Sequence, residues 1–548
     1  MRRSLILSLL IAATTSLFAQ SLTEKIDVSL VNVDVTVSSH GAPARGLTRD
    51  DFQVFEDGVS MPITNFYAVE PPPPAGRVTP APSTNDVVVA DPADERFRRK
   101  VLVIVDNRHV SMHNRDRALA ALERFVDDRF TGGTYDWSIA LISRETHVML
   151  PLTSDKAKLH EAVAAIRRIV INPERPSDED VTRLAKVADR DNNPDTPVAG
   201  ASPSEKLGDL TSLGTRFEMQ ADGTRTVDAI RDAIQSFAGA PGRKIILLVT
   251  GSLGFDDTAS PLNANPGSFV GGPSAIAEST RWATVLRDSL IREANALNVS
   301  FYIVNSEGLT AGGDDSGATG TTGSVGRSME SGSSNQLATM YWLARETGGR
   351  LMPGNSPEKS LTEFDQASST FYSLAYKPTH GDDGKYHSIK VRLKQSGYQL
   401  QYRTGYSSVP VSVQLARAMQ SPLATTMQPS SIPIGIITGN SRPKNAQGIL
   451  AVPLHATVPA KNLQFIPTGN GSVARVDLYV SVFDDRGRRI SGNHLTREAH
   501  AETGTETAGN FVETRELLVK RNVPYRVVVA VHDQVTDAIG IATKIVRF

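Results

Sequence analysis

"KVLVIVDNRHVS", residues 100–111, decides the fold of this chain. Five consecutive apolar residues run directly into Asp106 and a polar stretch. A short apolar run that ends in this way is typical of a strand buried on both faces of a parallel sheet. The stretch therefore predicts an α/β domain in which a polar loop begins at Asp106.

The chain on the carboxyl side of this strand alternates between further apolar strands and amphipathic helices. The expected strands are "DWSIALI" (136–142), which forms a hairpin with "THVMLPL" (146–152), "KIILLVT" (244–250) and "VSFYIVN" (299–305). Helical spacing of apolar residues predicts helices within 155–170, 224–238, 334–346 and 358–370. We expect a doubly wound, mostly parallel sheet over 99–370, with mobile insertions at 172–215 and 309–333.

β segments flank this region on both sides. "VSLVNVDVTV" (28–37) alternates with a period of two, and Asp57-Gly58 in "GLTRDDFQVFEDG" (46–58) indicates a hairpin turn. "KYHSIKVRL" (385–393) and "YQLQYRTGY" (398–406) predict a second hairpin around 395–397. Because neither flank is large enough to be stable alone, we expect 20–70 and 371–407 to form one small β domain, into which the α/β domain is inserted.

The remaining boundaries follow from composition. Residues 71–98 are proline-rich and are expected to be a linker, and 408–445 are expected to be a second linker. Alternating strands and polar turns over 446–548 predict an all-β sandwich of the immunoglobulin-like kind.

The amino-terminal residues have the layout of a secretory signal. Arg2 and Arg3 precede an apolar run over 5–13, and small residues end at Ala19, so we expect a signal peptide over 1–19. A membrane anchor is the alternative, but the run is shorter than the roughly 20 residues that a spanning helix needs. With no cysteine and no later span, the expected location is secreted or periplasmic in a bacterium.

Composition and motifs exclude several classes of function. The 58 basic and 59 acidic residues nearly cancel, so nothing attracts nucleic acid. No phosphate-binding glycine motif is present, so no nucleotide cofactor is expected. No convergent set of acid, base and nucleophile is apparent, and the chain is expected not to be an enzyme.

Several stretches together resemble a von Willebrand factor A (VWA) domain. They are the strand that ends at Asp106, "APGRKIILLVTG" (240–251), "ETGGRL" (346–351), and the tail "YSLAYKP", "DDGKYHSIKVRL" and "YRTGY" (372–406). The chain is more closely similar to the bacterial VWFA-related family first described from acidobacteria, whose members begin with a β segment like "GLTRDDFQVFEDG". The resemblance covers roughly 25–407 and implies binding at the carboxyl edge of the sheet.

In VWA domains this edge usually carries a metal site with the motif Asp-x-Ser-x-Ser, a threonine from a second loop and an aspartate from a third. Asp106 matches the first aspartate, but Arg108 and Val110 occupy the serine positions, and Gly251 occupies the position of the third-loop aspartate. The threonine is Thr224 or Thr226.

Two interpretations of this edge stay open. Asp256 or Asp257 could reach the site and Ser111 could replace a displaced serine, so that Asp106, Thr224 and Asp256 hold Mg²⁺, Mn²⁺ or Ca²⁺. The favoured interpretation has no metal, because a guanidinium repels a divalent cation, and has Asp106 capping the loop or pairing with Arg108. A second candidate for calcium, also disfavoured, is the loop that contains Asp189, Asp191, Asn193 and Asp195.

The expected function is therefore protein binding or adhesion outside the cytoplasm. The partner, which the sequence does not name, would contact loops around 106–114, 251–260 and 305–333, with Asp106, Arg108, Ser111, Thr224, Asp256 and Asp257 as the candidate contact residues. Two alternatives are a metal-dependent adhesin and a structural component of a cell-envelope assembly.

Overall fold

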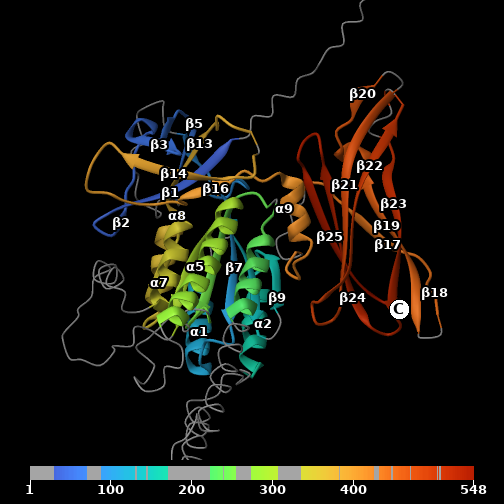
Figure 1. Cartoon of the computed structure of the whole chain (residues 1–548), viewed down its shortest axis with the longest axis horizontal. Coiled ribbons are helices and arrows are strands. Elements are labelled where there is room, and N and C mark those ends of the chain that lie inside the picture. The colour runs from blue at the N-terminus through green and yellow to red at the C-terminus, as the bar shows by residue number, and fades with distance from the viewer. Residues whose placement is uncertain are drawn as a thin grey trace, which may run out of the picture.

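The computed structural model describes residues 30–70, 88–129, 133–143, 146–170, 223–238, 240–254, 273–306, 335–381, 383–424, 431–445, 448–468, 471–502, 504 and 508–548. This part of the chain has a mixed α/β fold in three units: a small β unit, an α/β unit and a C-terminal β unit (Figure 1). The predicted signal peptide and the two predicted insertions lie outside the described residues.

The α/β unit is built on a six-stranded sheet in the order β12-β11-β10-β7-β8-β9. Strand β7, which contains the decisive apolar run, lies inside the sheet and is buried along its whole length. The neighbouring strands are parallel except β9, which runs antiparallel to β8. The strands are β7 (Arg99–Asp106), β8 (Tyr135–Ile142), β9 (Thr146–Thr153), β10 (Arg243–Thr250), β11 (Val299–Asn305) and β12 (Arg350–Pro353).

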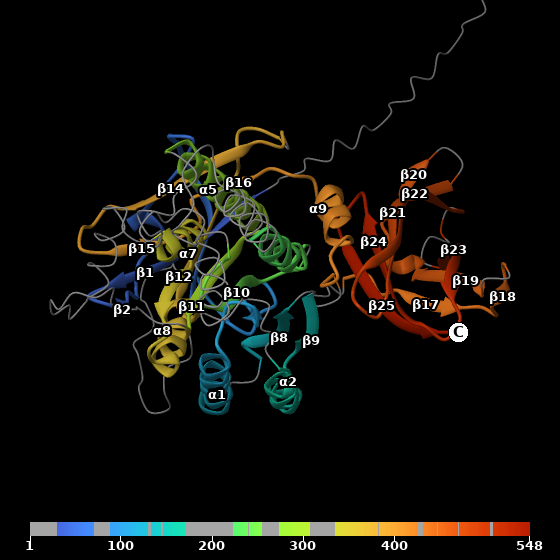
Figure 2. The ribbon, with the colours of Figure 1, turned by 60° about the horizontal axis from the view of Figure 1, so that its bottom comes forward.

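Helices cover both faces of this sheet (Figure 2). Successive side chains of a strand point to opposite faces, so Val101, Val103 and Val105 pack against α1, α2 and α8, whereas Leu102 and Ile104 pack against the other layer. The helices are α1 (Met112–Arg129), α2 (Lys156–Arg168), a helix over 223–235, α5 (Pro273–Ala296), α7 (Asn335–Glu346) and α8 (Pro357–Ser369). None of the described helices is long and apolar enough to cross a membrane.

The small β unit combines strands from both sides of the α/β unit. In one sheet β1 pairs with β13, and in the other β3 pairs with β14, so segments more than 300 residues apart share one core. The turn at Asp57-Gly58 joins β3 to β4, and both residues have the positive φ (47° and 84°) that a tight hairpin turn requires. The strands are β1 (Val31–Ser39), β2 (Ala42–Pro43), β3 (Phe52–Glu56), β4 (Val59–Met61), β5 (Ile63–Val69), β6 (Val88–Ala90), β13 (Phe371–Tyr376), β14 (Tyr386–Leu393), β15 (Gln399–Gln401) and β16 (Gly405–Ser407); a 3-10 helix spans Arg49–Asp51.

The hairpin predicted around 395–397 forms only in part: residues 386–388 pair antiparallel with residues 405–407, as predicted, but the residues nearer the turn do not pair with one another. Strand β14 pairs with β3 on one side and with β16 on the other, whereas β15 pairs with β1 in the other sheet. Strand β16 pairs only with residues 386–388, and the segment between β14 and β16 crosses to the edge of β1, where it forms β15.

The C-terminal β unit consists of two sheets around an apolar core of alternate strand residues. Its strands are β17 (Gly435–Thr438), β18 (Arg442–Pro443), β19 (Ile449–Pro459), β20 (Ile466–Thr468), β21 (Gly471–Phe483), β22 (Arg489–Ala501), β23 (Asn510–Lys520), β24 (Pro524–Asp533) and β25 (Ile539–Arg547), with a 3-10 helix over Ala460–Asn462. Two segments expected as linkers contain regular structure, because β6 lies within 71–98, and α9 (Val411–Ala418), β17 and β18 lie within 408–445.

The segment around α9 packs on two units at once. Leu415 of α9 is buried against Tyr479 and Phe483 of the C-terminal β unit, whereas Leu423 belongs to the core of the α/β unit. The Ser421 hydroxyl donates to the backbone oxygen of Asp232, in the helix over 223–235 (3.0 Å). Burial, followed by the charge of Asp228, raises the pKa of Asp232 to about 7.

This raised pKa predicts a pH-dependent loss of stability. The folded state holds the Asp232 proton more tightly than the unfolded chain does, so stability falls as the pH rises from about 4 to about 7. We expect Asp232→Asn to raise the free energy of unfolding by on the order of 2 kcal/mol near pH 8 and to change it little near pH 4. Urea denaturation at both pH values measures this, and an equal effect at both would contradict the assignment.

Candidate functional site

Asp106 is the last residue of β7, and its side chain is completely buried. The neighbouring strand β10 ends beside it, because Val249 of β10 pairs with Val105 and Thr250 follows Val249. Side chains at the carboxyl ends of two parallel strands thus meet at one edge of the sheet. This edge is where the sequence predicted a binding site.

The Asp106 carboxylate is occupied by groups of the protein itself. His109 Nδ1 lies 2.8 Å from Oδ2, and the Thr250 hydroxyl donates to the same oxygen over 2.8 Å. The backbone N–H of Arg108 donates to Oδ1 (3.1 Å). Burial opposes the charged form, but the charge and hydrogen bond of His109, the Thr250 hydroxyl and the Arg108 N–H together hold the pKa of Asp106 below its usual value.

Backbone hydrogen bonds fix the loop that carries His109. The N–H of Gly251 donates to the carbonyl oxygen of His109 (3.0 Å), and the N–H of Asn107 donates to that of Ile142 (2.9 Å). The completely buried Arg115 of α1 donates to the Asn107 side chain over 2.9 Å and to the carbonyl oxygen of Ile169 over 2.8 Å. These contacts anchor the loop to the ends of both neighbouring strands and to α1, and they hold His109 in place.

The threonine that contacts Asp106 is Thr250, which was not among the predicted residues. The predicted threonines are Thr224, which is exposed, and Thr226, which is buried, both in the helix over 223–235. Thr250 could have been found, since it ends the strand next to β7 as Asp106 ends β7 itself.

The other predicted residues fall into two groups. Arg108 is half-buried, and Ser111 is exposed just before α1, where its hydroxyl accepts from the N–H of Asn114 (3.4 Å). The remaining candidates lie outside the described residues: Asp256, Asp257, Asp189, Asp191, Asn193 and Asp195. Most of the loops 251–260 and 305–333 lie outside them as well.

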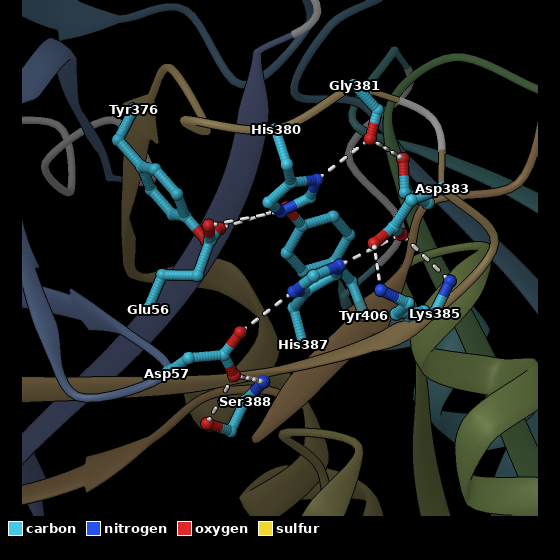
Figure 3. Close-up of polar contacts among 11 residues, drawn as sticks. Glu56, Asp57, Tyr376, His380, Gly381, Asp383, Lys385, His387, Ser388 and Tyr406 are labelled. Atoms are coloured by element: carbon cyan, nitrogen blue, oxygen red, sulfur yellow. Dashed lines mark hydrogen bonds and ion pairs between the residues drawn. The ribbon is translucent and has the colours of Figure 1, made fainter.

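A second polar cluster lies in the small β unit and was not predicted (Figure 3). Among the described residues, Glu56, His380 and His387 are the histidine and carboxylate side chains that could share a metal ion, with their ligand atoms within 4.8 Å of one another. The sequence signal was the pair of histidines in "HGDDGKYH", with two aspartates between them. Glu56 comes from a strand more than 300 residues away, so no local pattern could join it to this pair.

Comparison with known proteins finds only weak structural similarity. No family model matches the chain, and no curated protein matches it. Among solved structures, an aerotolerance-related membrane protein from Bacteroides fragilis is similar over 49% of this chain and 98% of its own (12% identity, TM-score 0.24). BatB from Bacteroides thetaiotaomicron has the same coverage with 14% identity and a TM-score of 0.22. Proximal thread matrix protein 1 from the mussel byssus is similar over 50% of this chain and 48% of its own (12% identity, TM-score 0.22). TM-scores of this size carry no functional assignment.

Proposed function

We propose that this chain is an extracytoplasmic, VWA-like module that binds a protein partner through the carboxyl edge of its central sheet, without a metal ion. The placement of this edge supports the proposal, because open α/β sheets bind their ligands beyond the carboxyl ends of the strands. The amino-terminal signal layout supports export. The immunoglobulin-like C-terminal unit would serve as a second module, and the proposal includes no catalytic step.

One observation carries the metal-independent form of the proposal. The carboxylate of Asp106, which a VWA-type site would offer to a divalent cation, accepts hydrogen bonds from His109, Thr250 and the Arg108 backbone. These three contacts occupy both carboxylate oxygens, which a metal would need. A bound cation would have to displace the buried His109 ring.

The surface beside Asp106 is suited to contact with a protein. Three consecutive exposed residues lie where the loop meets α1: Ser111, followed by Met112 and His113 of the first helical turn. Met112 is 48% exposed, and methionine adapts its shape readily to a partner surface. This segment is the described part of the edge at which we propose that the partner binds.

Photo-crosslinking in the cells that produce the protein tests the proposal. A photoreactive amino acid at Met112 is expected to give an adduct of discrete mass, and EDTA is expected not to weaken it. The matched control is Lys158, which is 62% exposed near the start of α2. It lies at the opposite edge of the sheet, since α2 follows β9, whose Thr153 pairs with Trp137 near the start of β8.

The partner captured in the adduct is then purified, and its binding to the chain is measured. Met112→Glu is expected to weaken its affinity for the chain at least tenfold, which is about 1.4 kcal/mol, whereas Lys158→Glu is expected to leave it unchanged. Equal adducts from both positions would refute the proposed surface. Loss of the Met112 adduct in EDTA would instead favour the metal-dependent adhesin.

A further inference from the structure

The polar cluster of the small β unit joins three separate parts of the chain (Figure 3). Glu56 ends β3, and Tyr376 ends β13. His380 lies in the connection from β13 to β14, and His387 is in β14. Tyr406 comes from β16. The cluster lies in a different unit from Asp106 and does not depend on the function proposed for the sheet edge.

The buried side of the cluster has more acceptors than hydrogens. Glu56 is 4% exposed, and its Oε2 accepts from the hydroxyls of Tyr376 (2.7 Å) and Tyr406 (2.9 Å). Its Oε1 lies 3.2 Å from His380 Nε2. The Tyr406 hydroxyl is also 3.1 Å from this nitrogen, but it has one hydrogen to give.

The position of the His380 hydrogen follows from its other contact. Nδ1 lies 2.8 Å from the carbonyl oxygen of Gly381, and a carbonyl only accepts, so Nδ1 carries the hydrogen. In the neutral ring, Nε2 then presents a lone pair to Glu56 Oε1. Two electron-rich atoms at this distance need a cation between them, either a proton or a metal ion.

His387 brings a second imidazole to the same place. Its ring stacks on that of His380 with centroids 3.7 Å apart. Its Nδ1 lies 2.8 Å from Asp57 Oδ2, and its Nε2 lies 3.1 Å from Asp383 Oδ1. A carboxylate that orients an imidazole through one nitrogen is the usual support of a metal-binding histidine, but here both nitrogens contact carboxylates, so one contact must be released before His387 can bind an ion.

We propose that Glu56, His380 and His387 bind one zinc-class transition-metal ion. Two tetrahedral ligands at about 2.1 Å from zinc lie about 3.4 Å apart, close to the 3.2 Å between Glu56 Oε1 and His380 Nε2. Two imidazoles with a carboxylate favour zinc over magnesium or calcium, which prefer oxygen ligands. Three carboxylates, those of Glu56, Asp57 and Asp383, supply the negative charge.

Binding requires a small rearrangement, because two stacked rings cannot both aim a nitrogen at one ion. His380 Nε2 already lies beside Glu56, so His387 is the ring that must turn, with release of its contact to Asp383, whose side chain is 29% exposed. The bound ion would tie the end of β3 to the connection between β13 and β14. The ion would therefore stabilise the contact between the amino-terminal strands and the strands that follow the α/β unit.

Metal analysis of the untagged, EDTA-treated chain tests this proposal. Equilibrium dialysis against Zn²⁺ is expected to leave one ion per chain and to raise the Tm by about 5 °C, whereas Mg²⁺ and Ca²⁺ are expected to have no effect. His380→Ala is expected to weaken zinc binding at least tenfold and to abolish the rise in Tm. The matched control is His160→Ala, which removes an accessible histidine that faces Glu123 and Asp127 but has no second imidazole in its ion-pair group.

The outcomes separate a metal from a proton. Absence of stoichiometric zinc in the wild-type chain would mean that protonation alone completes the cluster, and it would overturn the proposal. Equal zinc binding by His380→Ala would overturn it as well. Folding of this variant is checked by its Tm in EDTA, and His380→Gln, which keeps a polar side chain but not the imidazole, is expected to lose zinc in the same way.

Discussion

Replacing His109 with alanine is expected to lower the free energy of unfolding of the α/β unit by about 3 kcal/mol. The variant leaves the Asp106 carboxylate buried with its hydrogen bonds to Thr250 and the Arg108 N–H but without the imidazole at 2.8 Å. A buried charge that loses its partner keeps its cost of desolvation. Denaturation followed by tryptophan fluorescence measures this unit, because all three tryptophans, Trp137, Trp282 and Trp342, lie within 99–370.

A second substitution identifies the cause of this loss. Asp106→Asn combined with His109→Ala removes the charge as well as its partner, and the double variant is expected to regain part of the stability. His160→Ala, at an accessible position on α2, is expected to change stability by less than about 0.5 kcal/mol. A His109→Ala chain as stable as the wild type would show that the imidazole does not hold the site, and the metal-independent proposal would lose its main support.

Replacing Gly349 with alanine is expected to cost about 3 kcal/mol or to prevent folding of the α/β unit. A Cβ atom at this position would lie 1.8 Å from the carbonyl oxygen of Phe301 and 2.5 Å from its carbon. Both are backbone atoms of β11, so no side chain can move to relieve the clash. Strand β12, which begins at the next residue, would have to separate from β11.

Gly381→Ala is the control for this prediction. An added Cβ there meets no atom within 4 Å, and Gly381 does not have a positive φ, so its stability is expected to stay within about 0.5 kcal/mol of the wild type. Thermal unfolding of the two variants side by side makes the comparison. Equal Tm values would contradict the close packing of β12 on β11.

The elements that were predicted correctly have local sequence signals. The apolar run at 101–105 gives β7, and alternate residues of that run enter the two cores of the α/β unit. The turn at Asp57-Gly58 was predicted correctly because that pair favours the positive φ that a tight turn needs. Burial on both faces and local turn geometry are each reflected in the types of residue that are neighbours in the sequence.

Pairing between distant strands has no such local sequence signal. Residues 385–393 and 398–406 have the pattern of a hairpin, but only their outer ends pair, through β14 and β16, whereas residues 389–393 pair with β3 and residues 399–401 pair with β1. The alternation of apolar residues shows which face of β14 is buried, and it is the same whichever strand lies alongside. The tertiary structure decided that β3 lies beside residues 389–393 and that residues 399–401 pair with β1.

The two polar sites show the same division. The sequence by itself determined that Asp106 ends a central strand and that the serines of a VWA-type metal motif are absent. Only the tertiary structure decided that His109 and Thr250 occupy the Asp106 carboxylate, and that Glu56 meets His380 and His387. The physical reason is that strand order and register fix distances between side chains far apart in the sequence, whereas residue pattern fixes only burial and local conformation.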